Sequence, residues 1–341
     1  MQGQCPQSIA LRSERTPLWC CGPAFAARSA GNAGRIPVLA EGGTGMMNKW
    51  LRSTDCLTFE MDAAIAWITL NRPAKRNALS RPLLRELREA MLEADDRKSI
   101  RCIVLQGAGK DFCAGYDMAA SSPAGAPLDG DYDPALYRQS ANGIDDDAWR
   151  LERNQADILT IFDLHKPVIA AVHGHCVAGG TDLALSCDMV IAARDARIGF
   201  PATRAQGTPP MHMWLHNIGP QWAKRLLLTG DMVSGRDAAR IGLVLKAVPT
   251  AQLQAEARAL AERLALIDAD VLAANKRIVN MGLELMGTRT LQRFAAETDA
   301  RGHLAAAARE FTRVAKQEGL SRAFKLRDAP FGDGMLRMDE E

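Results

Sequence analysis

Residues 166–188 read KPVIAAVHGHCVAGGTDLALSCD and carry the strongest indication of the fold. Val168–Val172 is a continuous apolar run with the length of a buried strand. Gly179 and Gly180 follow it, and the apolar residues beyond them recur at helical spacing, so a helix is expected to begin there. A strand, a glycine turn and a helix in succession predict an α/β fold.

Apolar runs on both sides of this stretch extend the pattern. Residues 57–60 and Ala64–Leu70 predict the two strands of a hairpin, and Cys102–Leu105 and Met189–Ala192 predict two further buried strands. Strands that alternate with helical or glycine-containing segments indicate a core in which most strands pair in parallel.

Helices are predicted between and after these strands. Ser80, followed by Pro82, is typical of a helix N-cap, and apolar residues at helical spacing continue this helix for about 17 residues. The polar stretch between Met118 and Lys166 predicts a loop and then a helix over residues 148–164. Beyond Pro220 we expect only helices, near 220–229, 234–241, 250–265, 269–286, 288–299 and 303–318.

The first 50 residues lack the periodicity of the rest of the chain. They are rich in Arg, Gly, Ala and Pro and contain few acidic residues, so we expect a disordered extension. A transit peptide has the same composition, and a gene start placed too far upstream of Met46 and Met47 is the alternative. We therefore divide the chain into this extension (1–50), a core (54–249) and a C-terminal helical region (250–330).

Composition weighs against several classes of function. The 341-residue chain has a formal net charge of +2 and lacks the basic clusters of a nucleic-acid-binding protein. Its eight cysteines show no CxxC spacing, which indicates reduced thiols, and its six histidines are not spaced as metal ligands. No apolar stretch approaches the roughly 20 residues that span a bilayer, so we expect a soluble, cytoplasmic protein.

Four stretches, taken in order and spacing, resemble the enoyl-CoA hydratase/isomerase (crotonase) superfamily. They are NRPAKRNAL (71–79), DFCAGYD (111–117), the stretch 166–188, and LTGD (228–231) followed by residues 238–244. The resemblance implies a crotonase-like ββα spiral core with a C-terminal all-α trimerisation region. It also implies an acyl-CoA substrate, no cofactor beyond the coenzyme A of that substrate, and a homotrimer or hexamer.

Thioester chemistry explains the glycines in two of these stretches. An enolate or tetrahedral intermediate places negative charge on the thioester oxygen, and two convergent N–H donors stabilise that charge. By the resemblance, the donors are the backbone N–H groups of Tyr116, which follows Gly115, and of Gly179, which precedes Gly180. A helix that begins here would also direct its positive dipole end at this oxygen.

The carboxylates are where the sequence departs from the family. Family hydratases use two glutamates, one three residues after the oxyanion glycine and one further along the chain. Here the first position is Asp182 and the second is Ala202. We expect Asp182 to be the acid–base group, and Thr203, Arg204 and His212 are candidate replacements for the missing acid.

The resemblance also indicates residues that contact coenzyme A. Arg76 lies where the family holds the 3′-phospho-ADP group, and Lys325 resembles a clamp on the adenine side that often reaches a neighbouring subunit. The other motif residues expected to contact the substrate are Ala78, Ala114, Gly115, Asp117 and Gly180.

We therefore expect a lyase or isomerase of the enoyl-CoA hydratase/isomerase type that stabilises a thioester enolate. The long 118–165 connection indicates a rebuilt lid, with Tyr132 and Tyr137 among its aromatic residues, and hence a non-standard acyl group. Two alternatives stay open. One is a CoA-thioester or carbon–carbon hydrolase of the same fold, and the other is a CoA-binding protein without catalysis, which Ala202 motivates.

Overall fold

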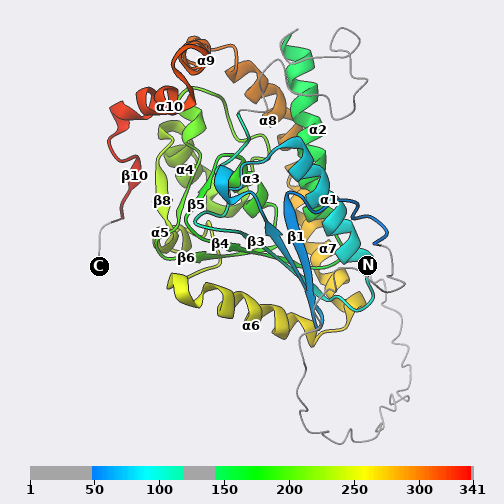
Figure 1. Ribbon diagram of the computed structural model, residues 1–341. Coiled ribbons are helices and arrows are strands. Elements are labelled where there is room, and N and C mark those ends of the chain that lie inside the picture. The colour runs from blue at the N-terminus through cyan, green and yellow to red at the C-terminus, as the bar shows by residue number, and fades with distance from the viewer. Residues whose placement is uncertain (1–47, 119–142, 339–341) are drawn as a thin grey trace, which may run out of the picture. The chain divides into compact units, whose positions relative to one another are not determined.

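The computed structural model describes residues 48–118 and 143–338, which all fall within one unit of the fold, Ile36–Glu341 (Figure 1). The expected extension lies almost entirely outside the described residues. The first half of the expected lid, with Tyr132 and Tyr137, also lies outside them.

Six strands form the main sheet in the order β1-β2-β3-β4-β6-β9. β1 and β2 pair antiparallel, which confirms the predicted hairpin, and the other neighbours pair in parallel. Every residue of β4 is buried, as expected for a parallel strand covered on both faces. The strands are β1 Leu57–Asp62, β2 Ile65–Leu70, β3 Cys102–Gly107, β4 Val168–Val172, β6 Met189–Ala193 and β9 Lys246–Val248.

Four short strands form a second sheet in the order β10-β8-β7-β5. Their bounds are β5 His175–Val177, β7 Arg197–Gly199, β8 Met232–Ser234 and β10 Met335–Leu336. The chain alternates between the sheets, because β4 joins the main sheet and β5 the second, and β6 and β7 repeat this order. The short helix α3 (Gly179–Leu185) separates the two pairs. This alternation confirms the predicted α/β fold with a ββα spiral.

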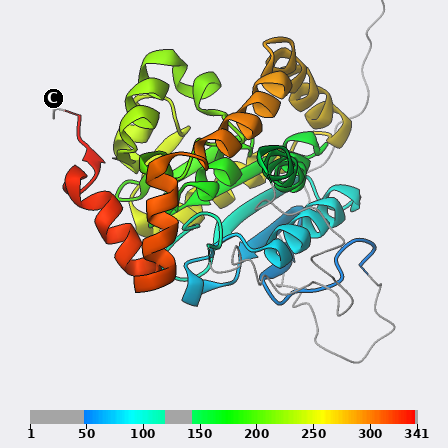
Figure 2. The same cartoon turned by 90° about the horizontal axis from the view of Figure 1, so that it is seen from above.

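Helices surround the two sheets, and none of those in the described part of the chain is long and apolar enough to cross a membrane. Ser80 caps α1 as predicted, since its hydroxyl accepts a hydrogen bond from the Leu83 N–H. α6 packs along the main sheet, and α2 packs beside α8, where Figure 2 shows α2 nearly end-on. Their bounds are α1 Arg81–Asp96, α2 Ile144–Asp163, α4 Trp214–Thr229, α5 Gly235–Arg240, α6 Leu253–Ala265, α7 Ala269–Leu285, α8 Thr288–Gly302, α9 Ala306–Glu318 and α10 Leu320–Asp328.

The expectation that the chain beyond Pro220 is entirely helical is wrong at β8, β9 and β10. Two or three residues are too few to show a strand periodicity, and these strands form because they pair with distant segments, such as β8 with β7 and β9 with β6. The helices between residues 250 and 330 are confirmed. α4 breaks at Gly219, whose φ is 68°, and continues from Pro220, where the sequence placed its start.

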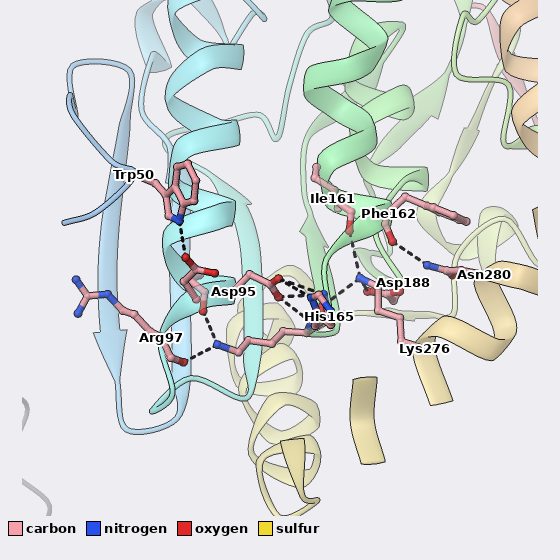
Figure 3. Close-up of polar contacts among 12 residues, drawn as sticks. Trp50, Asp95, Arg97, Ile161, Phe162, His165, Asp188, Lys276 and Asn280 are labelled. Atoms are coloured by element: carbon pink, nitrogen blue, oxygen red, sulfur yellow. Dashed lines mark hydrogen bonds and ion pairs between the residues drawn. The ribbon is translucent and has the colours of Figure 1, made fainter. Parts of the chain in front are cut away.

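A buried lysine fastens α7 to the core (Figure 3). Lys276 Nζ lies 2.9 Å from Asp188 Oδ2 and donates to the Ile161 carbonyl oxygen at 3.1 Å. One turn later, Asn280 donates to the Phe162 carbonyl oxygen at 2.7 Å. Both carbonyl groups belong to the last turn of α2, which has no helical partners for them and favours positive charge. Two side chains of α7 therefore supply hydrogen-bond donors to the last turn of α2, and these bonds hold α7 against the core.

Candidate active site

Two glycine-containing loops lie side by side at the centre of the fold, a first glycine loop (residues 111–117) and a second glycine loop (residues 173–180). The Cys113 N–H donates to the His175 carbonyl oxygen at 3.0 Å, and the Val177 N–H donates to the Cys113 carbonyl oxygen at 3.1 Å. This short parallel ladder joins stretches that are about sixty residues apart in the sequence, as parallel pairing across a crossover requires.

The close approach of these loops explains two glycines. A Cβ atom on Gly180 would lie 2.5 Å from the Cys113 carbonyl oxygen, which is closer than atoms can approach. Gly115 has a φ of 98°, a left-handed conformation that glycine adopts without strain. A Cβ atom there would lie 3.0 Å from the Cβ of Ala178. Side chains at either position would push the loops apart.

The loops present two backbone N–H groups that have no acceptor among the described residues, those of Tyr116 and Gly179. The bridge to Leu79 uses the Gly115 carbonyl and the Asp117 N–H, so the Tyr116 N–H points away from that bridge. Gly179 is the first residue of α3, and first-turn N–H groups have no partner within their helix.

The side chain of Tyr116 lies over Gly179 and reaches Asp182. A Cβ atom on Gly179 would lie 2.8 Å from Tyr116 Cε2, so the absence of a side chain there gives the ring its place. The Tyr116 hydroxyl donates to Asp182 Oδ2 at 3.1 Å. Tyr116, Gly179 and Asp182 therefore lie together. Gly115 and Gly180 are the chain neighbours of Tyr116 and Gly179.

Asp182 is a buried carboxyl group with one unpaired oxygen. The residue is 2% exposed, and its Oδ1 has no hydrogen-bond partner. Burial, with a smaller contribution from the Asp299 carboxylate, raises the pKa of Asp182 to about 8, although the hydrogen bond from the Tyr116 hydroxyl acts in the opposite direction. At neutral pH the carboxyl group therefore carries its proton and can donate it.

The loop after β2 is fixed to the first glycine loop by Asp111. The Asp111 carboxylate accepts hydrogen bonds from Arg76 Nε at 2.8 Å and from His175 Nδ1 at 2.7 Å. Burial acts to raise the pKa of Asp111, but these hydrogen bonds outweigh burial and lower this pKa to about 2. The carboxylate therefore stays ionised. Arg76 is half exposed, with 51% of its side chain accessible, which leaves part of its guanidinium able to meet a ligand.

Other residues expected to contact substrate occupy the same region, with one exception. The Ala114 N–H donates to the Arg76 carbonyl at 2.9 Å, and Asp117 forms an ion pair with Arg72 at 2.8 Å, which orders the turn after Tyr116. Ala78 lies in the same loop as Arg76. Lys325 is the exception, because it lies exposed in the last turn of α10, in a different segment of the chain from the glycine loops.

Two of the candidate replacements for the missing acid form hydrogen bonds away from the glycine loops. Thr203 Oγ1 donates to the Leu227 carbonyl oxygen at 2.8 Å, and Arg204 Nε donates to the Thr229 carbonyl oxygen at 3.0 Å. Both side chains satisfy carbonyl groups at the end of α4, so neither is free for acid–base chemistry. His212 is half-buried, its Nδ1 is enclosed and has no hydrogen-bond partner among the described residues, and burial lowers its pKa, which favours the neutral imidazole.

Sequence reasoning missed a group of titratable residues on α2 and at the end of α8, namely Asp147, Asp299 and the C-cap residue His303. Asp299 falls on the buried face of α8, at helical spacing from the buried residues Gln292, Ala295 and Ala296. An acid on an otherwise buried face was the available signal. No set of three or more His, Cys, Asp or Glu side chains in residues 48–118 and 143–338 is arranged to hold a metal ion.

Comparison with known proteins agrees with this architecture. The model of the enoyl-CoA hydratase/isomerase family matches residues 60–310. A probable mitochondrial enoyl-CoA hydratase from Dictyostelium discoideum is 32% identical over 232 residues, which covers 67% of this chain and 76% of that protein. A crotonyl-CoA hydratase from Syntrophomonas wolfei is 29% identical over 279 residues, covering 81% and 97% of the two chains.

Solved structures show the same likeness. An enoyl-CoA hydratase from Mycobacterium smegmatis superposes with a TM-score of 0.76 at 34% identity, over 83% of this chain and 96% of the other. An enoyl-CoA hydratase/isomerase from Xanthobacter autotrophicus gives a TM-score of 0.72 at 33% identity, over 82% and 99%. The chain belongs to the enoyl-CoA hydratase/isomerase family, and it is an enzyme of that type.

The pKa of Asp182 makes the stability of the fold depend on pH. Its folded-state pKa of about 8 lies above the unfolded value of 3.8, so the proton contributes stability that is complete below pH 4 and is lost as the pH rises through 8. We expect Asp182→Asn to gain about 5 °C or more in melting temperature, relative to wild type, between pH 5 and pH 9. Calorimetry across this range measures the difference, with Asp55→Asn, a change at an exposed carboxylate, as the control. A difference that stays constant with pH would show that Asp182 titrates normally.

Proposed function

We propose that this enzyme stabilises the enolate of an α,β-unsaturated acyl-CoA thioester with the backbone N–H groups of Tyr116 and Gly179. The observation that carries the proposal is the convergence of two loops that leave these two N–H groups without acceptors beside a buried acid, Asp182. The reaction is the hydration or the isomerisation of the double bond of the acyl group.

The two N–H groups act on charge that develops during the reaction. When the β-carbon is attacked or a proton is removed, the electron pair moves onto the thioester oxygen. Donors held in place by the loop ladder need not reorganise as that charge appears, and removal of one such donor typically costs about 10²–10³ in kcat. The left-handed conformation of Ala178, with a φ of 50°, directs the Gly179 N–H and is a strain of the kind found at functional sites.

Asp182 supplies the proton to the α-carbon in this proposal. Because its raised pKa keeps it protonated at neutral pH, it is suited to act as a general acid when the enolate collapses. The Tyr116 hydroxyl holds Oδ2, which leaves Oδ1 as the oxygen that faces the reactant. Ala202 offers no second acid where family hydratases have one, so simple crotonyl-CoA is expected to be a poor substrate.

Coenzyme A is proposed to bind along the loop after β2. The exposed part of the Arg76 guanidinium would meet a phosphate of the 3′-phospho-ADP group, with Ala78, Ala114 and Asp117 on the adjoining loop. Lys325, exposed on α10, would contact the adenine end of a coenzyme A bound to a neighbouring subunit.

The acyl group is a non-standard one, because the connection between β3 and α2 is long. The relatives include an (E)-benzylidenesuccinyl-CoA hydratase from Thauera aromatica, which is 32% identical over 67% of this chain and is named for a bulky acyl group. A panel of enoyl-, dienoyl- and aromatic acyl-CoAs with mass-spectrometric readout tests the reaction class. A gain of one water indicates hydration and an unchanged mass with a new retention time indicates isomerisation. Release of free coenzyme A would instead support a hydrolase, and binding without any product would support a CoA-binding protein.

Removal of the Gly179 N–H tests the proposed oxyanion site. Gly179→Pro lacks the donor, and Gly179→Ala is its matched control, since it crowds the Tyr116 ring with the same Cβ atom but keeps the N–H. With the substrate that the panel finds, we expect kcat of the proline variant to fall about 100-fold or more below that of the alanine variant. Calorimetric titration with coenzyme A should give similar affinities for both. Equal turnover by the two variants would remove Gly179 from the oxyanion site.

We further propose that the enzyme assembles as a homotrimer or hexamer through its C-terminal helices. α7 exposes a row of large apolar side chains, among them Ile278, Val279, Met281 and Leu285, and Leu285 is 88% exposed. Apolar surface of this extent usually marks an interface.

Two charges on this face should separate the subunits. Burying unpaired charges in an interface is costly, so we expect Ile278→Glu combined with Leu285→Glu to be monomeric by light scattering coupled to size-exclusion chromatography. Lys98→Glu, at an exposed turn after α1, is the control and should keep the wild-type mass. A wild-type protein that is monomeric at micromolar concentration would contradict the assembly.

A further inference from the structure

We propose that Asp299 on α8 is the second carboxylate of this active site, in place of the acid that is missing at Ala202. The inference rests on the function proposed above. It assigns to this chain an acid–base pair drawn from α3 and from the C-terminal helical region.

The loop that carries Ala202 leads directly to Asp299. The Gln206 N–H donates to the Ala202 carbonyl oxygen at 2.7 Å, and two residues later the Thr208 N–H donates to Asp299 Oδ1 at 2.8 Å. A Cβ atom on Gly207 would lie 1.9 Å from that same carboxylate oxygen. The absence of a side chain at Gly207 therefore makes room for the Asp299 carboxylate, which contacts the same loop that carries Ala202.

α8 approaches this loop closely enough to fix the carboxylate. A Cβ atom on Gly302 would lie 2.9 Å from the Gly207 Cα, so two glycines face each other where the helix crosses the loop. Asp299 lies one turn earlier on α8 and is only 6% exposed. A carboxylate buried to this extent requires specific partners or a function, because its desolvation is unfavourable.

The Asp299 carboxylate acts electrostatically on groups already placed at the site. Burial is the larger cause, and the Asp299 charge adds to it in raising the pKa of both Asp182 and the Tyr116 hydroxyl. Two buried polar atoms in this region, Asp182 Oδ1 and Thr208 Oγ1, have no hydrogen-bond partner among the described residues. Unsatisfied buried groups are rare in folded proteins, and a polar reactant between the two carboxyl groups would satisfy them.

A chain of titratable and charged side chains also leads to Asp299. His303 Nε2 lies 3.8 Å from Asp299 Oδ1, and His303 Nδ1 lies 2.5 Å from Asp147 Oδ2 on α2. Arg150 in turn forms an ion pair with Asp147 at 2.8 Å. Burial lowers the pKa of His303, but the carboxylates of Asp147 and Asp299 outweigh it and raise this pKa above the ordinary value, which favours the positively charged form of the imidazole next to Asp299.

The two carboxyl groups differ in the way that an acid and a base must differ. Burial raises the pKa of Asp299 to about 6 and that of Asp182 to about 8, while His303 lowers the former. Between these values Asp299 is ionised and Asp182 is protonated. Environments that separate two such pKa values assign the base to the first and the acid to the second.

The hydration step balances with this assignment. Asp299 takes a proton from water as the water oxygen bonds to the β-carbon, and the electron pair of the double bond moves through the α-carbon to the thioester oxygen. The enolate then collapses and its α-carbon takes the proton of Asp182. Proton exchange with solvent restores both carboxyl groups. In an isomerisation, Asp299 would remove a proton at one carbon and Asp182 would return one at another.

Two reactions of the same enzyme separate the roles of the two acids. Exchange of the α-protons of butyryl-CoA in D₂O, measured above pH 8 where Asp182 is ionised and can remove the proton, needs the oxyanion donors and Asp182 but no second carboxylate, whereas turnover of the unsaturated substrate needs both carboxyl groups. We expect Asp299→Asn to lose at least about 100-fold in turnover and to keep its exchange rate within about fivefold of wild type. Asp182→Asn should lose both. The asparagine retains an oxygen to accept from Thr208, and Glu297→Gln, exposed on the same helix, is the matched control.

The outcomes are distinct. Turnover by Asp299→Asn within tenfold of wild type would overturn this inference and leave the proposed function intact. Equal loss of turnover and exchange, with a lowered melting temperature, would show that Asp299 is only structural and would overturn it as well. A wild-type enzyme that binds acyl-CoA but shows neither reaction would overturn the proposed function itself.

His303 provides a second readout because it acts through Asp299. Removing its positive charge should raise the pKa of Asp299, so in His303→Gln the acidic limb of the kcat/KM profile should move to higher pH. The charges that face Asp299 and remain in this variant are Asp147, Arg150 and Asp182. An unchanged acidic limb would contradict Asp299 as the base.

Discussion

The parallel ladder between the first and second glycine loops is the interaction on which the rest of the site depends. Only two backbone hydrogen bonds link Cys113 to the second loop, yet they require glycine at 115 and 180, because any side chain there would separate the strands. The ladder uses the backbone groups on one side of each loop. It leaves the N–H groups of Tyr116 and Gly179 without acceptors among the described residues, in the loops next to the buried carboxyl group of Asp182.

The surroundings of the ladder hold it in place and bury its cysteine residues, Cys113 and Cys176. Asp111 connects the loop after β2 to both glycine loops through Arg76 and His175. α9 and α10 pack over Met118 and Ala205, which flank the site in sequence. A dry site strengthens the interaction of backbone donors with developing charge, and the same burial keeps Asp182 protonated at neutral pH.

Much of the fold and of the site is predictable from local sequence. The other elements and site residues depend on contacts between residues that are distant in the chain. The strand at 168–172, the cap at Ser80 and the paired glycines leave local signals, and so does Asp182 next to Gly179. β8 and β9 leave none, because three-residue strands exist only through their partners. The sequence leaves Thr203 and Arg204 as candidate acids because it does not show that both side chains donate hydrogen bonds to carbonyl groups at the end of α4. Asp299 is nearly one hundred residues from Ala202, and only the packing of α8 brings Asp299 to the loop that carries Ala202.

The central claim is that the thioester oxygen is held by two backbone donors, and the most direct measurement is the ¹³C resonance of the thioester carbonyl in bound butyryl-CoA labelled at that carbon. Two hydrogen bonds in a water-excluded site polarise the carbonyl more than bulk water does. The account predicts a clear downfield shift of the resonance on binding. A bound carbonyl that resonates where it does in free solution, under conditions in which binding is saturated, would contradict it.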